Sequence, residues 1–323
     1  MQAIVQDTYG PTDVLELREV DRPEISADEV LVRVHAAGVD RGVWHLMTGL
    51  PYPVRLAYGL RSPRSQTPGM DLAGVVVAVG ADVTRFRPGD EVLGIGVGTF
   101  AEYARAPEAK LVAKPAGLTF EQAAVVAISG ATALQAVRDH GQVRPGHRAL
   151  VIGASGGVGT YAVQIAKAYG AEVTGVASGT KLDLVRSLGA DHVVDYARDD
   201  FADGSRRYDV VVDIGGNSSL TRLRRSLTPT GTAVITGGET DGRWLGGYDR
   251  QLRASLLSPF VGQRLTTFVN KEALEHLLAL VDLLESGQVV PAVDRAFPLA
   301  EAAKAVRYVE EGHARGKVVV TVT

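Results

Sequence analysis

The sequence contains no cysteine. This absence excludes disulfide bonds, a thiolate nucleophile and every zinc site that needs cysteine ligands. The chain also lacks an apolar run near the ~20 residues that a membrane-spanning helix requires. Its first residues, MQAIVQDTYG, show no basic region followed by an apolar one. We therefore expect a cytoplasmic protein that is not embedded in a membrane.

Neither charge sign is in clear excess. The 34 Lys and Arg residues nearly balance the 37 Asp and Glu residues, the formal net charge is −3, and neither sign forms a long run. Proteins that bind nucleic acid or an anionic membrane surface normally carry a basic cluster, so we expect neither partner. The 323 residues suffice for two domains, each with its own core.

A cluster of glycines follows a short apolar run near the middle of the chain. Residues 149–152 are all apolar, which is typical of a strand buried on both faces of a parallel sheet. After the glycines, apolar residues recur at three and four residue steps up to Gly170, which indicates a helix and its end. The predicted order is strand, glycine turn, helix.

That order is typical of a turn that holds the phosphates of a dinucleotide. Positions 154, 156 and 159 match G-x-G-x-x-G, with alanine in the first position. The second position lets the backbone approach a pyrophosphate, the third lets the helix pack on the strand, and the first helical N–H groups face the phosphate charge. The candidate cofactor residues here are Ala154, Ser155, Gly156, Gly157, Val158 and Gly159. A tight turn without a ligand is the alternative.

The hydrophobic period changes near residue 122. Before it, short strands such as residues 30–37 alternate with turns, which indicates a mainly β domain. After it, apolar strands alternate with helical patterns, which indicates a doubly wound parallel sheet in an α/β domain. Residues 265–269 are a candidate last strand of that sheet. The strand at 317–322 is expected to return to the first domain, so the predicted ranges are 1–121 with 263–323 for the mainly β domain and 122–262 for the dinucleotide-binding domain.

Residues 51–68 are rich in Pro, Arg and Ser, with Tyr and Leu between them. A loop of that length in a compact domain is often functional, for example as a flap over a site. A surface excursion anchored by a few aromatic side chains is an equally open interpretation.

The end of the second expected strand bears on the choice of cofactor. NAD sites commonly place an acid there, roughly 20 residues beyond the glycines, on the ribose 2′-hydroxyl. Here residues 176–181 read VASGTK, without a carboxylate. A hydroxyl and an ammonium can instead bind a 2′-phosphate, so the sequence predicts NADPH, with Ser178, Lys181 and Tyr196 as candidate ligands. A helix N-cap at Ser178 and a solvated Lys181 are the alternatives.

Several stretches together resemble the medium-chain dehydrogenase/reductase superfamily over nearly the whole chain. They are GGVGTYAVQIAKAYGAEVTGVA, PGMDLAGVVVAVG, FRPGDEV, GTFAEYARAPE and GHARGKVVVTV. Within the superfamily, the chain most resembles the zinc-free quinone oxidoreductase branch, related to zeta-crystallin, whose glycine motif also begins with alanine. The resemblance implies a Rossmann domain, a discontinuous GroES-like catalytic domain, a small-molecule substrate in the cleft between them, and a homodimer.

The resemblance also bears on zinc. Zinc alcohol dehydrogenases of the superfamily have a cysteine after Gly-Val and a Gly-His-Glu downstream, where this chain has Asp40 and Gly69-Met70-Asp71. The four-cysteine structural lobe is missing as well, so we expect neither zinc site. Zinc normally stabilises charge on a single oxygen, whereas quinones and α,β-unsaturated carbonyls spread that charge over several atoms. Conjugated acceptors are therefore the expected substrates.

Further site residues follow from the resemblance. It aligns His45 with a tyrosine that lies near the nicotinamide and Asp40 with an asparagine. His45 can donate a proton, and Asp40 can orient His45 or a substrate group. The alternatives are a satisfied polar residue beside Trp44 and a cap of the next helical turn. Thr132 would lie near the nicotinamide, or its hydroxyl bonds back within its helix.

The last candidate cofactor residues, Gly215, Gly237 and Gly238, follow apolar strands, at the sheet edge where ligands bind. Lys317 belongs to the terminal stretch of the resemblance, and we expect a structural role for it.

The leading functional prediction is an NADPH-dependent reductase of quinones or enones, which includes tailoring reductases of secondary metabolism. A second is an alcohol or carbonyl oxidoreductase with a different metal site, built from Asp40, His45 and Asp71. A third is an NADPH-binding sensor or structural protein without turnover.

Overall fold

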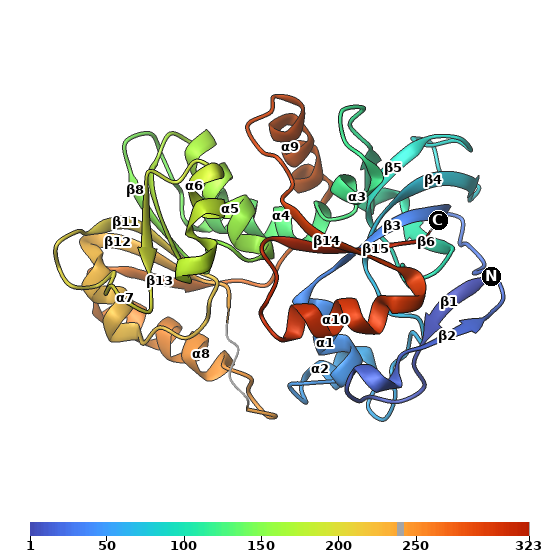
Figure 1. The fold of residues 1–323 in the computed structure, drawn as a ribbon, viewed down its shortest axis with the longest axis horizontal. Coiled ribbons are helices and arrows are strands. Elements are labelled where there is room, and N and C mark those ends of the chain that lie inside the picture. The colour runs from blue at the N-terminus through green and yellow to red at the C-terminus, as the bar shows by residue number, and fades with distance from the viewer. Residues whose placement is uncertain (238–241, 323) are drawn as a thin grey trace. The chain divides into compact units, whose positions relative to one another are not determined.

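The structure is a computed structural model that describes residues 1–237 and 242–322, and it divides into two compact units (Figure 1). The first unit comprises Met1–Ala131, Glu272–Glu285 and Pro291–Thr323, and the second comprises Thr132–Lys271 and Ser286–Val290. These ranges differ from the predicted ones at both boundaries. Residues 122–131 belong to the first unit, and residues 263–271 belong to the second because their strand pairs with its sheet.

The second unit is built on a parallel sheet of six strands. Its order is β10-β9-β8-β11-β12-β13, and every neighbouring pair is parallel. This is the 3-2-1-4-5-6 order of a dinucleotide-binding fold, so the predicted doubly wound sheet is confirmed. The strands are β8 Arg148–Ile152, β9 Glu172–Ala177, β10 His192–Asp195, β11 Tyr208–Asp213, β12 Leu227–Ile235 and β13 Arg264–Thr267.

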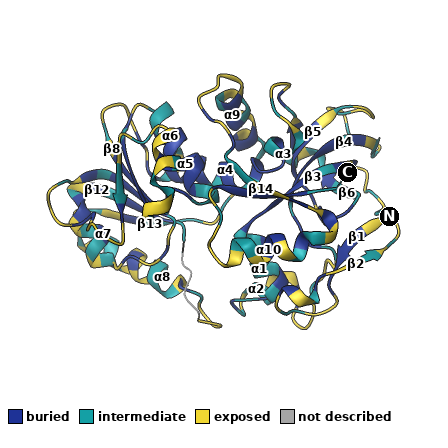
Figure 2. Ribbon diagram, in the orientation of Figure 1, coloured by how far each residue is buried: buried dark blue, intermediate teal, exposed yellow. Residues whose placement is uncertain are grey.

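Helices cover both faces of this sheet (Figure 1). Leu223 of α7 and Ala254 of α8 pack into one apolar cluster with Leu150 and Val211 of the sheet, while α5 and α6 lie on the opposite face. The inner strands β8, β9 and β11 are mostly buried and the outer helix surfaces are exposed (Figure 2), as the continuous apolar runs require. The helices are α5 Gly157–Ala168, α6 Leu182–Ser187, α7 Leu220–Ser226 and α8 Tyr248–Leu257.

The first unit is mainly β, as predicted. One sheet has the order β14-β15-β3-β4-β5-β7, with β6 also paired to β3, and a second sheet consists of β1 and β2. The terminal strand β15 runs antiparallel to β3, with Val318 opposite Val39, so its predicted return to this domain is confirmed. The strands are β1 Gln2–Val5, β2 Glu16–Glu19, β3 Glu29–Val39, β4 Asp71–Val79, β5 Glu91–Ile95, β6 Tyr103–Pro107, β7 Leu111–Ala113, β14 Val293–Pro298 and β15 Lys317–Thr321.

The core of the first unit follows the alternation seen in the sequence. Val30, Val32 and Val34 of β3 are fully buried and share an apolar cluster with Val306 of α10. A short helix, α2, lies within residues 51–68, so this segment is not irregular throughout. The helices are α1 Arg41–Thr48, α2 Val54–Tyr58, α3 Phe120–Ala123, α9 Leu274–Glu285 and α10 Ala302–Glu310, and α4 Ala127–Leu134 spans the boundary between the units.

Across the described residues, none of the helices combines the length and the apolar character that crossing a bilayer would require.

Candidate functional site

The glycine turn lies between β8 and α5, as predicted. Gly153 follows the last residue of β8 and has a φ of +85°, and α5 begins at Gly157. A Cβ on Gly159 would lie 2.1 Å from the carbonyl oxygen of Gly153, so only glycine allows the helix to pack this closely. Gly156, by contrast, would meet no atom closer than 3.5 Å. Packing therefore requires glycine at position 159, whereas a Cβ at position 156 would make only an ordinary van der Waals contact.

The start of α5 leaves backbone donors at this turn. The Thr160 N–H donates to the Gly156 carbonyl and is the first backbone donor that continues the helix. The N–H groups of Gly157, Val158 and Gly159 precede it, where a helix offers no intrahelical acceptor. Donors at the positive end of a helix dipole can hold a phosphate.

A cavity of about 390 Å³ opens beside the turn. It gathers predicted cofactor residues from the ends of four strands: Ser155 after β8, Ser178 and Lys181 after β9, Tyr196 after β10, and Gly215 after β11. Gly153, which was not predicted, also lies in its wall. No Asp or Glu is among its lining residues in the described part of the chain. The other predicted residues of the turn, which are Ala154, Gly156, Gly157, Val158 and Gly159, are not among its lining residues.

Two details bear on the alternatives for the 2′-phosphate residues. Ser178 holds the N-cap position of the turn at Gly179–Lys181, but its side chain makes no capping hydrogen bond there. Its hydroxyl lies 3.5 Å from that of Thr180. Tyr196 is 61% exposed at the cavity. Capping therefore does not account for Ser178.

Sequence reasoning missed a second cation at this cavity. Arg222 of α7 lines it, with its guanidinium 4.3 Å above the Phe201 ring and its Nε 2.9 Å from an oxygen of Asp200. Nothing in the pattern of α7 separates Arg222 from Arg224 and Arg225 on the same helix. Only the fold places it at the site.

The sequence reasoning also overlooked one acid. Asp195 ends β10, and a Cβ on Gly179 would lie 2.6 Å from its Oδ2. Its Oδ1 accepts a hydrogen bond from the Ala197 N–H at 3.1 Å, and the carboxylate does not line the cavity. The Asp195 carboxylate therefore makes its hydrogen bond within its own turn.

The ends of β11 and β12 lie close together. A Cβ on Gly237 would lie 2.0 Å from the Ile214 carbonyl oxygen, and one on Gly153 would lie 3.0 Å from the Gly215 nitrogen. The backbone at Gly215 therefore lies close to that at Gly153, and the backbone at Gly237 lies close to that at Ile214. Gly238 lies outside the described residues. Thr132 is half-buried on α4, and its role near the nicotinamide stays a prediction.

His45 lies on α1, half-buried beside Trp44. Its Nδ1 is 2.7 Å from the Leu50 carbonyl oxygen, and the two rings meet edge to face at 5.1 Å. A carbonyl can only accept, so Nδ1 carries the proton and Nε2 is the nitrogen that takes up or releases one. This geometry suits a satisfied polar residue and a proton donor alike, and the catalytic role of His45 stays a prediction.

Asp40 is engaged elsewhere. Its Oδ1 accepts hydrogen bonds from the Ser129 hydroxyl at 2.8 Å and from the Lys317 ammonium at 2.5 Å. It occupies the N-cap position of α1, yet its side chain makes no capping bond. The capping alternative is therefore wrong, and the strong bonds of this carboxylate run to Ser129 and Lys317. The expected structural role of Lys317 fits its burial, at 2% exposed.

Asp71 completes this buried cluster. Its Oδ2 lies 3.8 Å from the Lys317 ammonium, and its Oδ1 accepts a hydrogen bond from the Ile128 N–H at 2.9 Å. Burial, together with the neighbouring Asp40 carboxylate, raises the pKa of Asp71 well above its usual range. Burial also opposes ionisation of Asp40, but Lys317 and the hydrogen bonds hold the pKa of Asp40 below its ordinary value. Asp40 therefore favours the charged form, which Lys317 balances, and Asp71 favours the protonated form.

These residues do not fit the metal site that we considered from Asp40, His45 and Asp71. The Lys317 ammonium already lies against both carboxyl groups, and Nδ1 of His45 faces a carbonyl. Among the described residues, no group of three or more His, Cys, Asp or Glu side chains has an arrangement that could hold a metal ion. The carboxyl groups of Asp40 and Asp71 therefore already lie against the ammonium of Lys317.

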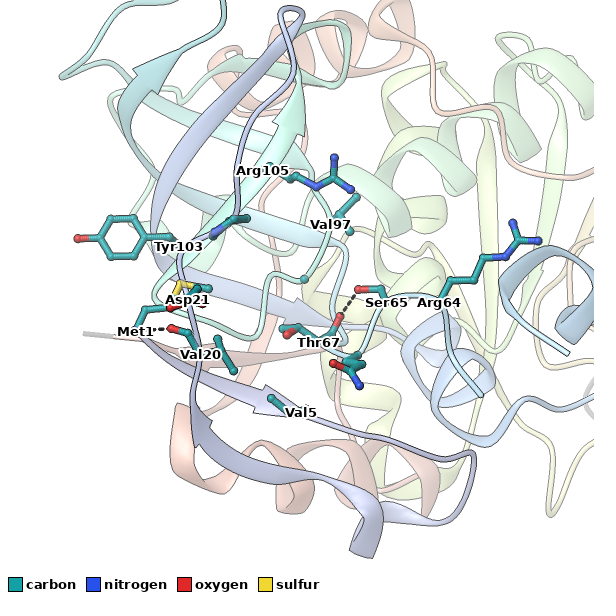
Figure 3. A pocket seen from close by; sticks show the side chains of 13 residues that line it. Met1, Val5, Val20, Asp21, Arg64, Ser65, Thr67, Val97, Tyr103 and Arg105 are labelled. Carbon is teal, nitrogen blue, oxygen red and sulfur yellow. Dashed lines mark hydrogen bonds between the residues drawn. The ribbon is translucent and has the colours of Figure 1, made fainter. Parts of the chain in front are cut away.

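Residues of the segment 51–68 line two hollows of the first unit. One, of about 260 Å³, has Tyr58 and Thr67 on its wall, with Leu46, Met70 and Ile95. The other, of about 510 Å³, is shown in Figure 3, where the Ser65 hydroxyl donates to the Thr67 carbonyl at 2.9 Å. None of the predicted site residues lines either hollow. The functional interpretation of this segment stays a prediction.

Comparison with known proteins gives two matching family models. An alcohol dehydrogenase GroES-like domain matches residues 26–116, and a zinc-binding dehydrogenase domain matches residues 188–320.

Individual proteins match over almost the whole chain. The chloroplastic quinone-oxidoreductase QR1 of Triphysaria versicolor is 32% identical, over 99% of this chain and 98% of that protein. The chloroplastic NADPH-dependent alkenal/one oxidoreductase of Arabidopsis thaliana is 35% identical, over 99% of this chain and 79% of that protein. The solved structure of the quinone oxidoreductase from Coxiella burnetii has a TM-score of 0.85 at 30% identity, covering 100% of this chain and 99% of that one.

Proposed function

Because this chain belongs to the medium-chain dehydrogenase/reductase superfamily, within its quinone oxidoreductase branch, we propose that it transfers a hydride from NADPH to a quinone or an α,β-unsaturated carbonyl. Oxidoreductase action on a small molecule is common to the relatives named above. The finer choices of cofactor and acceptor rest on residues of this chain.

One observation carries the choice of NADPH. The cavity beside the glycine turn has Lys181 and Arg222 in its wall and no carboxylate among its described lining residues. A ribose 2′-hydroxyl favours an acid as partner, whereas a 2′-phosphate favours cations and hydroxyl donors. Ser178, Lys181 and Tyr196 would hold that phosphate, and the turn 154–159 with the start of α5 would hold the pyrophosphate.

The acceptor class follows from the charge cluster in the first unit. Lys317 lies where a Lewis acid would need to bind Asp40 and Asp71, so these carboxyl groups are not offered to a metal. An acceptor whose negative charge spreads over an enolate or hydroquinone needs only a few directed hydrogen bonds. Quinones and enones meet this condition, and simple ketones do not.

In the proposed mechanism, bound NADPH supplies the hydride. The chain supplies the orientation of the cofactor and a proton. His45 holds a proton at Nε2 when it is cationic, and its bond from Nδ1 to the Leu50 carbonyl fixes the ring for the transfer. Asp40 acts indirectly, because it holds the N-cap position of α1 and its carboxylate ties the start of that helix to Lys317 and Ser129.

We also propose a homodimer located in the cytoplasm. The balanced charge and the lack of a basic cluster in the sequence support a protein that contacts neither nucleic acid nor membrane.

The test is NADPH oxidation measured against matched quinones, enones and simple ketones, each with and without a strong chelator. We expect turnover with the first two classes, little with ketones, and no effect of the chelator. Turnover restricted to ketones or alcohols and abolished by the chelator would establish the metal-dependent alternative. Tight NADPH binding without oxidation across the whole panel would identify a sensor or structural protein instead.

A further inference from the structure

A buried ion pair lies at the carboxyl end of β11 in the second unit, next to the candidate cofactor site. The Arg250 guanidinium of α8 lies with Nη1 2.6 Å from Oδ2 of Asp213, the last residue of β11. The Asp213 side chain is fully buried and that of Arg250 is 13% exposed. No motif in the sequence indicates this pair, because its members are 37 residues apart.

The same guanidinium binds two carbonyl groups. Nη1 donates to the Ser218 carbonyl and Nη2 donates to the Gly237 carbonyl, each at 2.7 Å. Ser218 lies in the segment after β11, and Gly237 lies just after β12. One side chain therefore joins the carboxyl ends of two neighbouring strands, as only a planar guanidinium with several donors can.

Asp213 extends this connection on its own side. Its Oδ1 accepts from the Gly216 N–H at 3.3 Å, and its backbone carbonyl accepts from the N–H groups of Thr236 and Gly237 at 3.0 and 3.2 Å. Gly216 has a φ of +74°, so the chain turns sharply where the carboxylate binds it. The carboxylate and the guanidinium thus hold the segment 214–218 from both ends.

This segment is a wall of the candidate cofactor cavity. Gly215, Asn217 and Ser218 line it together with Gly153 and Ser155 of the glycine turn. The backbone of Gly215 is so close to Gly153 that a Cβ on Gly153 would lie 3.0 Å from the Gly215 nitrogen. A shift of the segment 214–218 by a fraction of an ångström therefore changes the shape of the cavity.

We propose that Arg250 is a positioning residue for the dinucleotide, which fixes the segment 214–218 and the end of β12 in the geometry that NADPH requires. Arg250 itself is not among the lining residues of the cavity, so it acts through Ser218, Gly237 and Asp213. This inference rests on the proposed function, since it presumes that the cavity holds the cofactor.

The alternative is a purely structural ion pair, and a double variant separates the two. Arg250→Met leaves the buried Asp213 carboxylate without its cation, which destabilises the fold whatever the role of the site. In Asp213→Asn/Arg250→Met that charge is gone and the amide oxygen can still accept from Gly216. Thermal stability should then be largely regained, while the Ser218 and Gly237 carbonyls remain without the guanidinium.

The measurement is the Kd of NADPH, from nicotinamide fluorescence, at a temperature where each variant is folded by circular dichroism. Arg253→Met is the matched control, because Arg253 lies one turn further along α8, is exposed and pairs with Asp249 on the same helix. We expect about tenfold weaker NADPH binding in the single and the double variant, the equivalent of one charge-assisted hydrogen bond. The KM for NADPH should rise accordingly, with the KM for the quinone unchanged.

Three outcomes decide the matter. Weakened binding in the stable double variant, with Arg253→Met like the wild type, supports the positioning role. Wild-type affinity in the double variant overturns it and leaves the ion pair as a purely structural feature. If the wild type binds neither NADPH nor NADH, the proposed function fails and this inference fails with it.

Discussion

Lys317 and Asp40 form a buried ion pair across 277 residues of sequence, with Nζ 2.5 Å from Oδ1. Their side chains are 2% and 8% exposed. Asp71 lies on the other side of the ammonium, 3.8 Å away. The two carboxyl groups of this cluster are therefore held together by a cation that belongs to the protein.

Loss of this cation should destabilise the fold strongly. Lys317→Met leaves Asp40 buried without its partner, so we expect the free energy of unfolding to fall by about 3–5 kcal/mol. Urea unfolding followed by circular dichroism measures this value. Lys304→Met removes an exposed lysine that pairs with Glu301 and should change stability by less than about 1 kcal/mol. Equal effects of the two substitutions would contradict the assignment.

Asp71 should be replaceable by asparagine, because burial and the neighbouring Asp40 carboxylate raise its pKa well above the usual range and so favour its uncharged form. Asp71→Asn should stay within about 1 kcal/mol of the wild type at pH 7. Asp40→Asn should be more destabilising, since it removes the carboxylate 2.5 Å from the Lys317 ammonium and leaves only Asp71, at 3.8 Å, to balance that charge. Urea unfolding of both variants at that pH makes the comparison. A large loss in Asp71→Asn would mean that Asp71 is ionised.

The same shift fixes the pH dependence. Between the unfolded and the raised folded pKa of Asp71, the folded state binds a proton that the unfolded chain has released. The stabilisation of the fold by protonated Asp71 is therefore complete below the unfolded pKa of about 3.9. It is lost as the pH rises through the raised folded pKa. The stability of the wild type should therefore decline over this interval relative to that of Asp71→Asn, as urea titrations at several pH values will measure. Parallel curves would refute the raised pKa of Asp71.

Gly159 should not tolerate a methyl group. Its Cβ would lie 2.1 Å from the Gly153 carbonyl oxygen, so Gly159→Ala must displace the glycine turn. We expect a loss of about 1–3 kcal/mol in stability and weaker NADPH binding, measured by thermal unfolding and nicotinamide fluorescence. Gly117→Ala is the control, since a Cβ there would meet no atom within 4 Å. Tight NADPH binding by Gly159→Ala would remove the turn from the cofactor site.

Lys181 should govern the preference for NADPH. Lys181→Ala removes a positive charge from the cavity wall, so the KM for NADPH should rise about tenfold while that for NADH stays the same. Arg186→Ala, on the exposed side of α6 and paired with Asp183, should affect neither value. Steady-state kinetics with both cofactors make the comparison. A wild type that uses NADH as well as NADPH would refute the role of both Ser178 and Lys181.

His45 should supply the proton. His45→Gln keeps a neutral donor of similar reach but no nitrogen that titrates near neutrality, so kcat for quinone reduction should fall about 10²-fold or more. The pH profile of kcat should also change, because glutamine cannot take up or release the proton. His140→Gln is the control, because His140 stacks on Phe268 in the second unit. An unchanged pH profile in His45→Gln would leave His45 as a satisfied polar residue beside Trp44.

Local patterns in the sequence were enough to predict the elements that carry the candidate cofactor site. The apolar run at 149–152, the glycines after it and the helical period up to Gly170 each act over a few residues, and β8 and α5 formed as expected. The absence of an acid after Val176 could also be interpreted from the sequence, because the carboxyl ends of parallel strands meet at one edge and the end of this strand is expected there. The cavity that gathers Ser178, Lys181 and Tyr196 follows from this rule.

The tertiary structure alone decided how the charged side chains pair. Asp40 was expected to orient His45 or a substrate group, but Lys317 and Ser129, 277 and 89 residues away, bind its carboxylate. No pattern in α7 or α8 indicated that Arg222 lines the cavity or that Arg250 binds Asp213. Apolar periodicity determines which segments become strands and helices, since burial requires it of each segment separately. The partner of a buried charge depends on which segments the fold brings within about 3 Å, and no local pattern specifies that.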